Sequence, residues 1–285
     1  MGNSEDSKRT DLSDIHAVQL EMMKTLAAVF EKNGLRYALY CGTLLGAIRH
    51  RGFIPWDDDV DLVMPLEDYR RFLRLAAEEL PRGYVVLTPE NSDTHVDPWA
   101  KVCLDGTTMM NRAHAAYDTH WGLFVDIYPM IGEHPARVLR KMQTKTIQFI
   151  KTVLSLEYYQ SLSCISWKGR LFRVLPRPVR RWTAICLLHL CMQPMEKSRR
   201  IGTIDAASFC GKYDRAWWDR MIKVPFEDAE FVVPAEYDRI LTQMYGDYMT
   251  PPPKAWRYGH DTGTGDMIYD AHKDYREYRK ELLGV

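Results

Sequence analysis

Four aspartates within five positions are the most chemically suggestive feature of this 285-residue chain. Asp57, Asp58, Asp59 and Asp61 lead directly into the apolar residues 62–64. Carboxylates at this density repel one another unless a proton or a cation is shared among them. Oxygen ligands of this kind are those that Mg²⁺ and Mn²⁺ prefer. The cluster therefore predicts a divalent metal site, and the alternative is a solvated acidic loop.

The direction of each carboxylate depends on where the following strand begins. Side chains alternate along a strand, so a start near Asp59 would point Asp59 and Asp61 to one face and Asp58 to the other. Asp57 shares the parity of Asp59 but precedes the strand, so we expect it to be an auxiliary ligand. The apolar residues that flank the acids indicate a core strand, which favours the metal site over the loop.

A further carboxylate lies in the segment "GLFVDIYPM", where Asp126 interrupts a run of apolar and aromatic residues. A charge in such a strand is costly to bury unless it is paired or bound to a metal. We expect Asp126 to be the third ligand of the metal site. The alternative is a buried salt bridge to a single arginine or lysine.

Ahead of the acids, Gly42-Thr43 joins a predicted strand to a short predicted helix. Backbone N–H groups at a helix start attract anions, so this turn predicts a phosphate site with the Thr43 hydroxyl as an added donor. A simple helix cap is the alternative. Arg49 and Arg51 lie between the turn and the acids, where either can neutralise a diphosphate. Of the two we favour Arg49, because it lies in the helix predicted to start at the turn. The alternative is that one of these arginines pairs with an aspartate in a structural salt bridge.

The elements that position these residues alternate between helix and strand in the first half of the chain. Apolar spacing predicts helices over 15–32, 43–50 and 65–80, and strands over 35–42, 59–64, 84–88, 101–104 and 122–130. The second half predicts mainly helices, over 134–160, 177–201 and 234–249. We therefore expect a flexible tail at 1–11, an α/β or α+β sheet core over 12–132, and a helical region over 133–285 packed on that core.

Charge and cysteine content narrow the class of protein. Lysine and arginine equal aspartate and glutamate at 38 each, so the overall charge does not argue for nucleic acid and we expect no nucleic-acid partner. The segment 137–181 is nevertheless strongly basic, with Glu157 as its single acid. We expect the basic region over 137–192 to contact anionic lipid or a lipid-linked acceptor. The alternative is a core helix with solvated neighbours.

Six cysteines without a C-x-x-C pair are typical of reduced thiols in a cytoplasmic protein. The N-terminus lacks the apolar segment of a secretory signal, and no apolar run reaches the length of a membrane span. The expected location is the cytoplasm, with association at the inner face of the membrane through the basic region.

A small-residue turn, D-x-D on a strand and a lone aspartate on a later strand resemble the nucleotidyltransferase fold of DNA polymerase β. The string "GTLLGAIRHRGFIPWDDDVDL" (residues 42–62) resembles, more narrowly, the signature of the LicD family of phosphocholine transferases, to which fukutin and fukutin-related protein are also similar. "AKVCLDGTT", "WGLFVDIYPM" and "FVVPAEYDRILTQMYGDYMTPPP" fit the same family pattern. The resemblance covers roughly residues 15–130 and 205–262.

The resemblance implies an α+β fold with a mixed sheet of the nucleotidyltransferase type. It also implies a Mg²⁺-dependent enzyme that transfers a phospho-alcohol, with phosphocholine from CDP-choline favoured, to a hydroxyl of a cell-surface glycan and releases CMP. Asp59, Asp61 and Asp126 would hold the metal, and Asp126 or Asp57 would take the acceptor proton. Alternatives are CDP-ribitol, CDP-glycerol or a sugar nucleotide as donor, nucleotidyl transfer with release of pyrophosphate, and a binding protein without catalysis.

Further residues follow from the same resemblance. Lys101 occupies the family's position for a phosphate contact, with an ordinary strand-edge lysine as the alternative. Tyr245, Asp247 and His260 match its C-terminal pattern, where aromatic rings can hold a quaternary ammonium, although a structural helix stop is equally compatible. Trp56, directly before the acids, is a candidate substrate contact or a packing residue.

Overall fold

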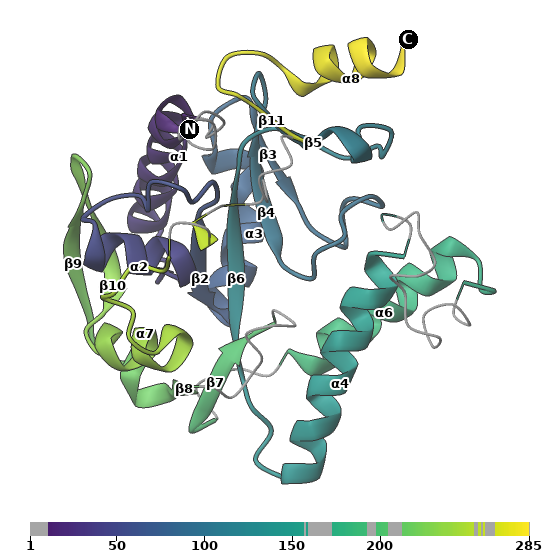
Figure 1. Ribbon diagram of the computed structural model, residues 1–285. Coiled ribbons are helices and arrows are strands. Elements are labelled where there is room, and N and C mark those ends of the chain that lie inside the picture. The colour runs from purple at the N-terminus through teal and green to yellow at the C-terminus, as the bar shows by residue number, and fades with distance from the viewer. Residues whose placement is uncertain are drawn as a thin grey trace.

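A computed structural model describes residues 11–156, 158, 173–192, 198–204, 213–253, 256–257, 259 and 266–284. Within these residues the chain is α+β, with a mixed sheet at its centre and helices around it (Figure 1). Nearly all of the predicted tail, and His260, lie outside the described residues. Among the described residues, no helix combines the length and the apolar character needed to cross a bilayer.

The central sheet has the strand order β1-β2-β6-β4-β3, and β7 and β8 extend it beside the far end of β6. Its strands are β1 (Ala38–Leu39), β2 (Asp61–Pro65), β3 (Tyr84–Leu87), β4 (Ala100–Leu104), β6 (Phe124–Gly132), β7 (Arg200–Thr203) and β8 (Tyr213–Asp214). Only β2 and β6 pair in parallel, and the other pairs are antiparallel. The mixed sheet that the sequence predicts is therefore present.

Strand register places the polar residues of three strands in one row. Asp61 on β2 is opposite Asp126 on β6, which is opposite Lys101 on β4. Residues directly opposite each other on neighbouring strands point to the same face of a sheet. Because side chains alternate along β6, Phe124 and Tyr128 share this face with Asp126. One face of the sheet thus carries two acids and a lysine side by side.

Helices and smaller sheets surround this core. The helices are α1 (Ser13–Lys32), α2 (Cys41–Arg49), α3 (Leu66–Glu79), α4 (Arg137–Leu154), α6 (Arg177–Cys191), α7 (Tyr237–Tyr245) and α8 (Tyr275–Leu283), with 3₁₀ turns η1 (Arg112–His114) and η4 (Arg215–Trp218). The strands β9 (Met221–Phe226) and β10 (Ala229–Pro234) form a hairpin, and β5 (Thr108–Asn111) pairs with β11 (Met267–Asp270). The α4–α6 pair projects away from the sheet (Figure 1).

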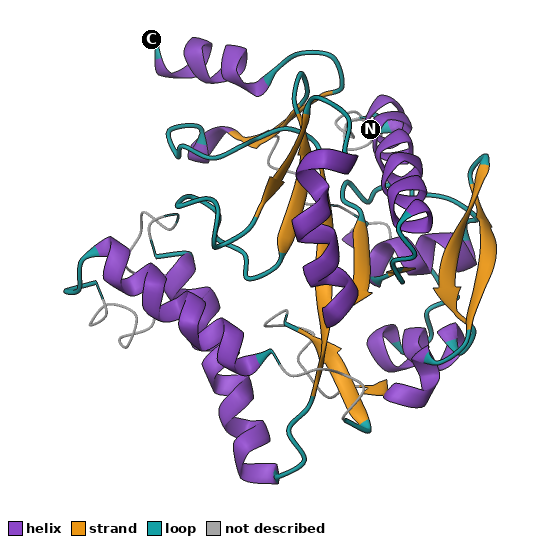
Figure 2. Cartoon of the chain, turned by 180° about the vertical axis from the view of Figure 1, so that it is seen from behind, coloured by secondary structure: helices purple, strands orange, loops and turns teal. Residues whose placement is uncertain are grey.

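Apolar spacing explains the position of α3. It begins directly after Pro65, and Leu66, Tyr69 and Phe72 recur on its buried face. This helix lies behind the sheet in Figure 1 and in front of it in Figure 2, so it covers one face. The helices predicted over 15–32 and 65–80 are confirmed to within two residues at each end.

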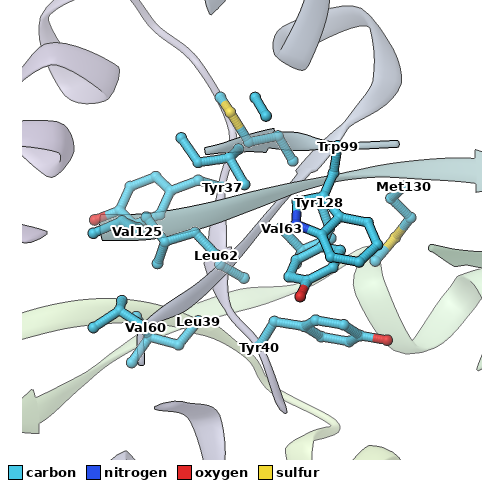
Figure 3. Packing of buried hydrophobic residues seen from close by; sticks show 14 of the residues in the cluster. Tyr37, Leu39, Tyr40, Val60, Leu62, Val63, Trp99, Val125, Tyr128 and Met130 are labelled. Atoms are coloured by element: carbon cyan, nitrogen blue, oxygen red, sulfur yellow. The ribbon is translucent and has the colours of Figure 1, made fainter. Parts of the chain in front are cut away.

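The face with the acids also has an aromatic layer. Figure 3 shows the Trp99 ring beside that of Tyr128, and their centroids are 4.6 Å apart. Tyr40 lies on the other side, 5.8 Å from Tyr128. The Tyr40 hydroxyl contacts those of Thr203 and Tyr213, at 3.3 and 3.1 Å, so the layer extends to β7 and β8.

Two predicted boundaries near the motif were wrong. The strand expected from about Asp59 begins at Asp61, and Gly42-Thr43 lies inside the first turn of α2 rather than before it. The strand expected over 35–42 is only β1, because its neighbour β2 pairs with just two of its residues. Strand length here depends on the partner strand, which local composition does not reveal.

The second half also contains strands that the sequence did not predict. The helix predicted over 177–201 ends at Cys191, and Ile201 lies in β7, where it pairs with Gly132 of β6. The β9–β10 hairpin was missed as well, although β9 alternates exposed and shielded side chains with the period of a strand. The described part of the second half therefore adds strands to the sheets as well as helices around them.

Candidate active site

The backbone of the acidic segment is held by α1. The His16 ring contacts the Asp57 carbonyl at 2.7 Å, and the Gln19 amide donates to the Asp58 carbonyl at 2.7 Å. The His16 ring also stacks on Phe53, with centroids 4.3 Å apart. These contacts hold the backbone of the acidic loop against α1.

The β9–β10 hairpin holds the same segment from the other side. Its turn residue Glu227 accepts a hydrogen bond from the Phe53 N–H at 3.0 Å and donates its own N–H to the Arg51 carbonyl at 2.8 Å. A side chain at Gly46 would meet the Gly52 carbonyl oxygen at 2.5 Å, so α2 and this loop approach closely. The glycine of "LLGAI" is therefore required by packing.

Asp61 is clamped at both of its backbone groups. Its N–H donates to the Thr43 hydroxyl at 2.8 Å, and its carbonyl accepts from the Tyr40 N–H at 2.9 Å. Thr43 thus joins the start of α2 to the start of β2. A Cβ at Gly42 would collide with the Asp57 carboxylate, so this acid lies against the first turn of α2, where the helix dipole stabilises negative charge.

Asp61 and Asp126 form the buried centre of the site. Each is only 6% exposed, and the Oδ1 atom of each makes no hydrogen bond. Burial raises the pKa of Asp126 to about 6, and the carboxylates of Asp97 and Asp59 add to this. Burial, followed by the charges of Asp59 and Asp126, raises the pKa of Asp61 well above its usual range. Two buried carboxylates side by side are suited to a cation.

The remaining acids gather at the mouth of this pair. Carboxylate oxygens of Asp57, Asp58 and Asp59 all lie within 4.8 Å of one another. Asp58 also accepts a short hydrogen bond from the Tyr269 hydroxyl on β11, but it belongs to the same cluster as Asp57 and Asp59, although it was predicted to point away. The charge of Asp59 adds to the raised pKa of both Asp61 and Asp126, so Asp59 is close to the buried pair. The structure thus groups Asp57, Asp58 and Asp59 beside Asp61 and Asp126.

Lys101 is the cation of this cluster. Its Nζ lies 3.4 Å from Asp126 Oδ1 and 3.9 Å from Asp97 Oδ2, and 3.4 Å from the centre of the Phe124 ring. Burial opposes its charge, but Asp126 and Asp97 outweigh burial and raise the pKa of Lys101. The salt bridge foreseen as the alternative for Asp126 is therefore present, and Asp126 also lies opposite Asp61. Asp97 was missed, although it stands four residues before Lys101 in the sequence.

Two arginines lie at the edge of the site. Arg49 donates to the Tyr248 carbonyl at 2.7 Å, and burial and the nearby charge of Arg257 lower the pKa of Arg49. The Arg257 guanidinium lies 4.9 Å from the centre of the Trp56 ring. Trp56 is therefore a platform for a cation. Arg257 was missed by the sequence analysis, because a lone arginine outside any motif has no distinctive signal.

The candidate residues near the C-terminus differ in their surroundings. Tyr245 is 44% exposed, but its hydroxyl end is enclosed, which raises the pKa of Tyr245, and the charges of Asp61 and Asp57 add to this. This tyrosine therefore faces the acids. Asp247 is exposed and accepts from the Thr250 hydroxyl at 2.7 Å, and the Tyr248 hydroxyl donates to Asp238 at 2.7 Å. These two make local structural contacts instead.

Comparison with known proteins places this geometry in context. The sequence model "LicD/FKTN/FKRP, nucleotidyltransferase domain" matches residues 34–174. The chain is 29% identical over 266 residues to the lipopolysaccharide cholinephosphotransferase LicD of Haemophilus influenzae, an alignment that covers 87% of this chain and 94% of that protein. It is also 39% identical over 95 residues to the ribitol 5-phosphate transferase FKRP of Mus musculus, covering 28% of this chain and 19% of that protein.

Proposed function

The chain belongs to the LicD family through the domain at residues 34–174, and on that premise we propose that it transfers phosphocholine from CDP-choline to a hydroxyl of a glycan or glycolipid, releasing CMP. That it is a phosphotransferase follows from its similarity to both a cholinephosphotransferase and a ribitol 5-phosphate transferase. Choline is favoured because the LicD relative aligns along nearly its whole length. The observation that carries the proposal is the pair of buried carboxylates of Asp61 and Asp126, which lie opposite each other on β2 and β6.

We propose that Asp59, Asp61 and Asp126 hold a divalent ion, Mg²⁺ or Mn²⁺, with Asp57 at its edge. The donor set is composed of hard oxygens, which fits either ion. When bound, the ion would neutralise the donor diphosphate and stabilise charge at the attacked phosphorus. Among the described residues, Lys101 and Arg49 are cations close to these carboxylates.

The side chains of this chain supply the remaining steps. Lys101 stays protonated and is placed to contact a phosphate oxygen beside Asp126. The acceptor oxygen forms a bond to the phosphorus that bears choline, the bond from that phosphorus to the CMP oxygen breaks, and the hydroxyl proton passes to a carboxylate. The carboxylate of Asp126 or that of Asp57 is the proposed acceptor of that proton. Gly42, Thr43 and Arg49 remain the proposed surroundings of the diphosphate.

The acceptor is proposed to be presented at a membrane surface. Val179, Trp182, Cys186 and Leu190 recur at helical spacing along α6 and are all exposed, opposite the buried Ala184 and Leu188 face. The described part of residues 137–192 contains lysines and arginines but neither aspartate nor glutamate. An apolar stripe in a basic setting fits an anionic lipid surface.

A second donor class is favoured by one observation, the similarity to FKRP across the motif region. In that case the chain would transfer ribitol phosphate, or a related alcohol phosphate, by the same chemistry. Nucleotidyl transfer is a different reaction and would release pyrophosphate rather than CMP. The products therefore separate these possibilities.

The test combines donor binding with product analysis. CDP-choline, CDP-ribitol, CDP-glycerol, GDP-mannose and ATP are compared by thermal shift with Mg²⁺, since a ligand of the native state raises its stability. CMP release is then measured with lipopolysaccharide as acceptor. We expect CDP-choline to stabilise the protein and to yield CMP, and Asp61→Asn or Asp126→Asn to abolish turnover. Asp219→Asn, at an exposed site away from the cluster, is the matched control. Full turnover in both acid variants would refute the site.

A further inference from the structure

A cavity of about 250 Å³ opens beside the acids, on the far side of Lys101. Lys101 and Asp97 belong to its wall, and so does Phe124, which shares the sheet face of Asp126. Because Lys101 Nζ is 3.4 Å from Asp126 Oδ1, the cavity begins one side chain away from the buried carboxylates. A phospho-alcohol whose phosphate lies at the acids would extend its alcohol in this direction.

The wall is built from aromatic rings set at different angles. The Tyr158 ring is at the centre of this group, 5.3 Å from Tyr117 at 89° and 6.3 Å from Trp121 at 40°. His114 stacks against Tyr158 at 4.2 Å, and its Nδ1 lies 2.7 Å from the Tyr158 hydroxyl. All four side chains line the cavity. They come from the segment after β5 and from beyond α4, so the fold assembles the wall from distant parts of the chain.

We propose that this cavity holds the trimethylammonium group of the phosphocholine that is transferred. This inference rests on the proposed function, and it assigns recognition of the alcohol to Tyr117, Trp121, Phe124 and Tyr158, with Asp97 as counter-charge. Aromatic faces attract a quaternary ammonium electrostatically, and tryptophan does so most strongly. The family pattern had suggested Tyr245 for this role, but Tyr245 faces the acids instead.

The charge of the cavity agrees with a cationic occupant. Burial lowers the pKa of each of three histidines in the wall, His95, His114 and His120, so these rings are uncharged at neutral pH. The Lys101 charge is balanced by Asp126 and Asp97, which lie within 4 Å of it. Lys101 itself lies over the Phe124 ring, which shows that this ring accepts a cation.

The size of the cavity is compatible with a choline head group. A cavity of about 150 Å³ accommodates benzene, which is of similar size to a trimethylammonium group. A cavity of about 250 Å³ therefore has room for the trimethylammonium group of choline.

The test uses a pair of probes that differ in charge but not in shape. Choline and its uncharged carbon isostere, 3,3-dimethyl-1-butanol, are titrated into the full chain and followed by ligand-observed NMR. The corresponding CDP derivatives are compared by kcat/KM for CMP release. We expect choline to be preferred by roughly 5- to 30-fold in both measurements, which is the range of cation–π attraction.

Variants of the wall residues test which side chains produce the preference for choline over its isostere. Trp121→Leu and Tyr117→Leu should each reduce it by several-fold, while Trp121→Phe should retain most of it and guards against a folding defect. Trp182→Leu removes an exposed tryptophan on α6 and should leave the preference unchanged. Asp97→Asn should weaken the binding of choline but not that of the isostere.

The outcomes distinguish this inference from the proposed function. If wild-type protein treats choline and the isostere alike, or if the preference survives both leucine variants, the assignment of the cavity is wrong even where CMP is released from CDP-choline. If choline is preferred through Trp121 but no CMP is released from CDP-choline, the cavity assignment stands and the proposed reaction fails. A preference for ribitol in the wild-type cavity would also overturn the assignment.

Discussion

Asp61 and Asp126 are costly residues for the metal-free protein. Each is buried, and repulsion from Asp59 adds to burial in raising the pKa of each, although the Lys101 charge lowers that of Asp126. A carboxylate whose folded pKa is raised disfavours folding at every pH above its unfolded value. The site therefore stores repulsion that a bound cation would relieve, which is the arrangement expected where activity opposes stability.

Neutralising Asp61 should therefore stabilise the protein in EDTA while abolishing activity. We expect Asp61→Asn to raise the free energy of unfolding by about 1 kcal/mol at pH 7.5, a shift of about 2–4 °C in Tm. The gain should shrink as the pH falls toward the ordinary aspartate pKa of about 3.9 and vanish below it, where Asp61 is protonated in the folded and the unfolded chain alike. Thermal denaturation across pH, with and without Mg²⁺, measures this. Lower stability of the variant in EDTA would contradict the assignment of repulsion.

A substitution at Lys101 should lower the free energy of unfolding of the metal-free protein, in contrast to Asp61→Asn. Lys101→Met leaves Asp126 and Asp97 without their buried counter-charge, which should destabilise the metal-free protein by about 3 kcal/mol. Loss of a phosphate contact should also reduce kcat/KM for the donor by about 100-fold. Urea denaturation and steady-state kinetics test the two effects separately. Unchanged stability in the variant would show that Lys101 is a solvated strand-edge lysine.

Among the elements, α2 matters because its first turn sets the start of β2. The Thr43 hydroxyl accepts the Asp61 N–H at 2.8 Å, so one side chain links the glycine-containing turn to the acid strand. Thr43→Val keeps the shape but leaves that N–H unpaired, and it should cost about 1–3 kcal/mol and lower kcat, whereas Thr43→Ser should preserve both. Stability and turnover of the two variants decide this. Equal loss in both would point to packing of the Thr43 methyl group instead.

The α4–α6 pair presents the other functional surface at this level. We expect Trp182→Glu or Leu190→Glu to weaken sedimentation of the protein with vesicles containing anionic lipid, because both place a charge in the exposed apolar stripe. Leu283→Glu introduces the same change on α8 and should have no effect. Raising salt should weaken binding of the wild type, since basic residues flank the stripe. Equal binding by wild type and both α6 variants would exclude this face.

For the molecule as a whole, the second half of the chain is part of the catalytic core. Tyr40, which is fully buried beside β1, has its hydroxyl against Thr203 and Tyr213. A fragment ending at residue 132 would expose this layer and remove the hairpin that holds Phe53. We expect such a fragment to lack a cooperative urea transition and a native near-ultraviolet dichroism spectrum. Cooperative unfolding of the fragment would support an independent core over 12–132.

Some of these features can be predicted from the sequence, and others cannot. The carboxylates, Lys101 and the helices α1 and α3 were predictable, because residue chemistry and 3.6-residue spacing are local properties. The boundaries of β1 and β2, and the strands β7 and β11, were not, since each depends on hydrogen bonding to a partner distant in sequence. Asp97 and Arg257 were missed for the same reason, as neither has a local signal.

The kind of chemistry could therefore be predicted from the sequence, from the density of acids and from the string between Gly42 and Leu62. The sequence did not predict which acids lie next to one another in the fold. The parallel pairing of β2 with β6 places Asp61 opposite Asp126, and the antiparallel pairing of β4 adds Lys101 to the row. Strand register is set by packing of whole faces rather than by neighbouring residues. For that reason the buried carboxylate pair and the aromatic cavity beside it become visible only when the chain is folded.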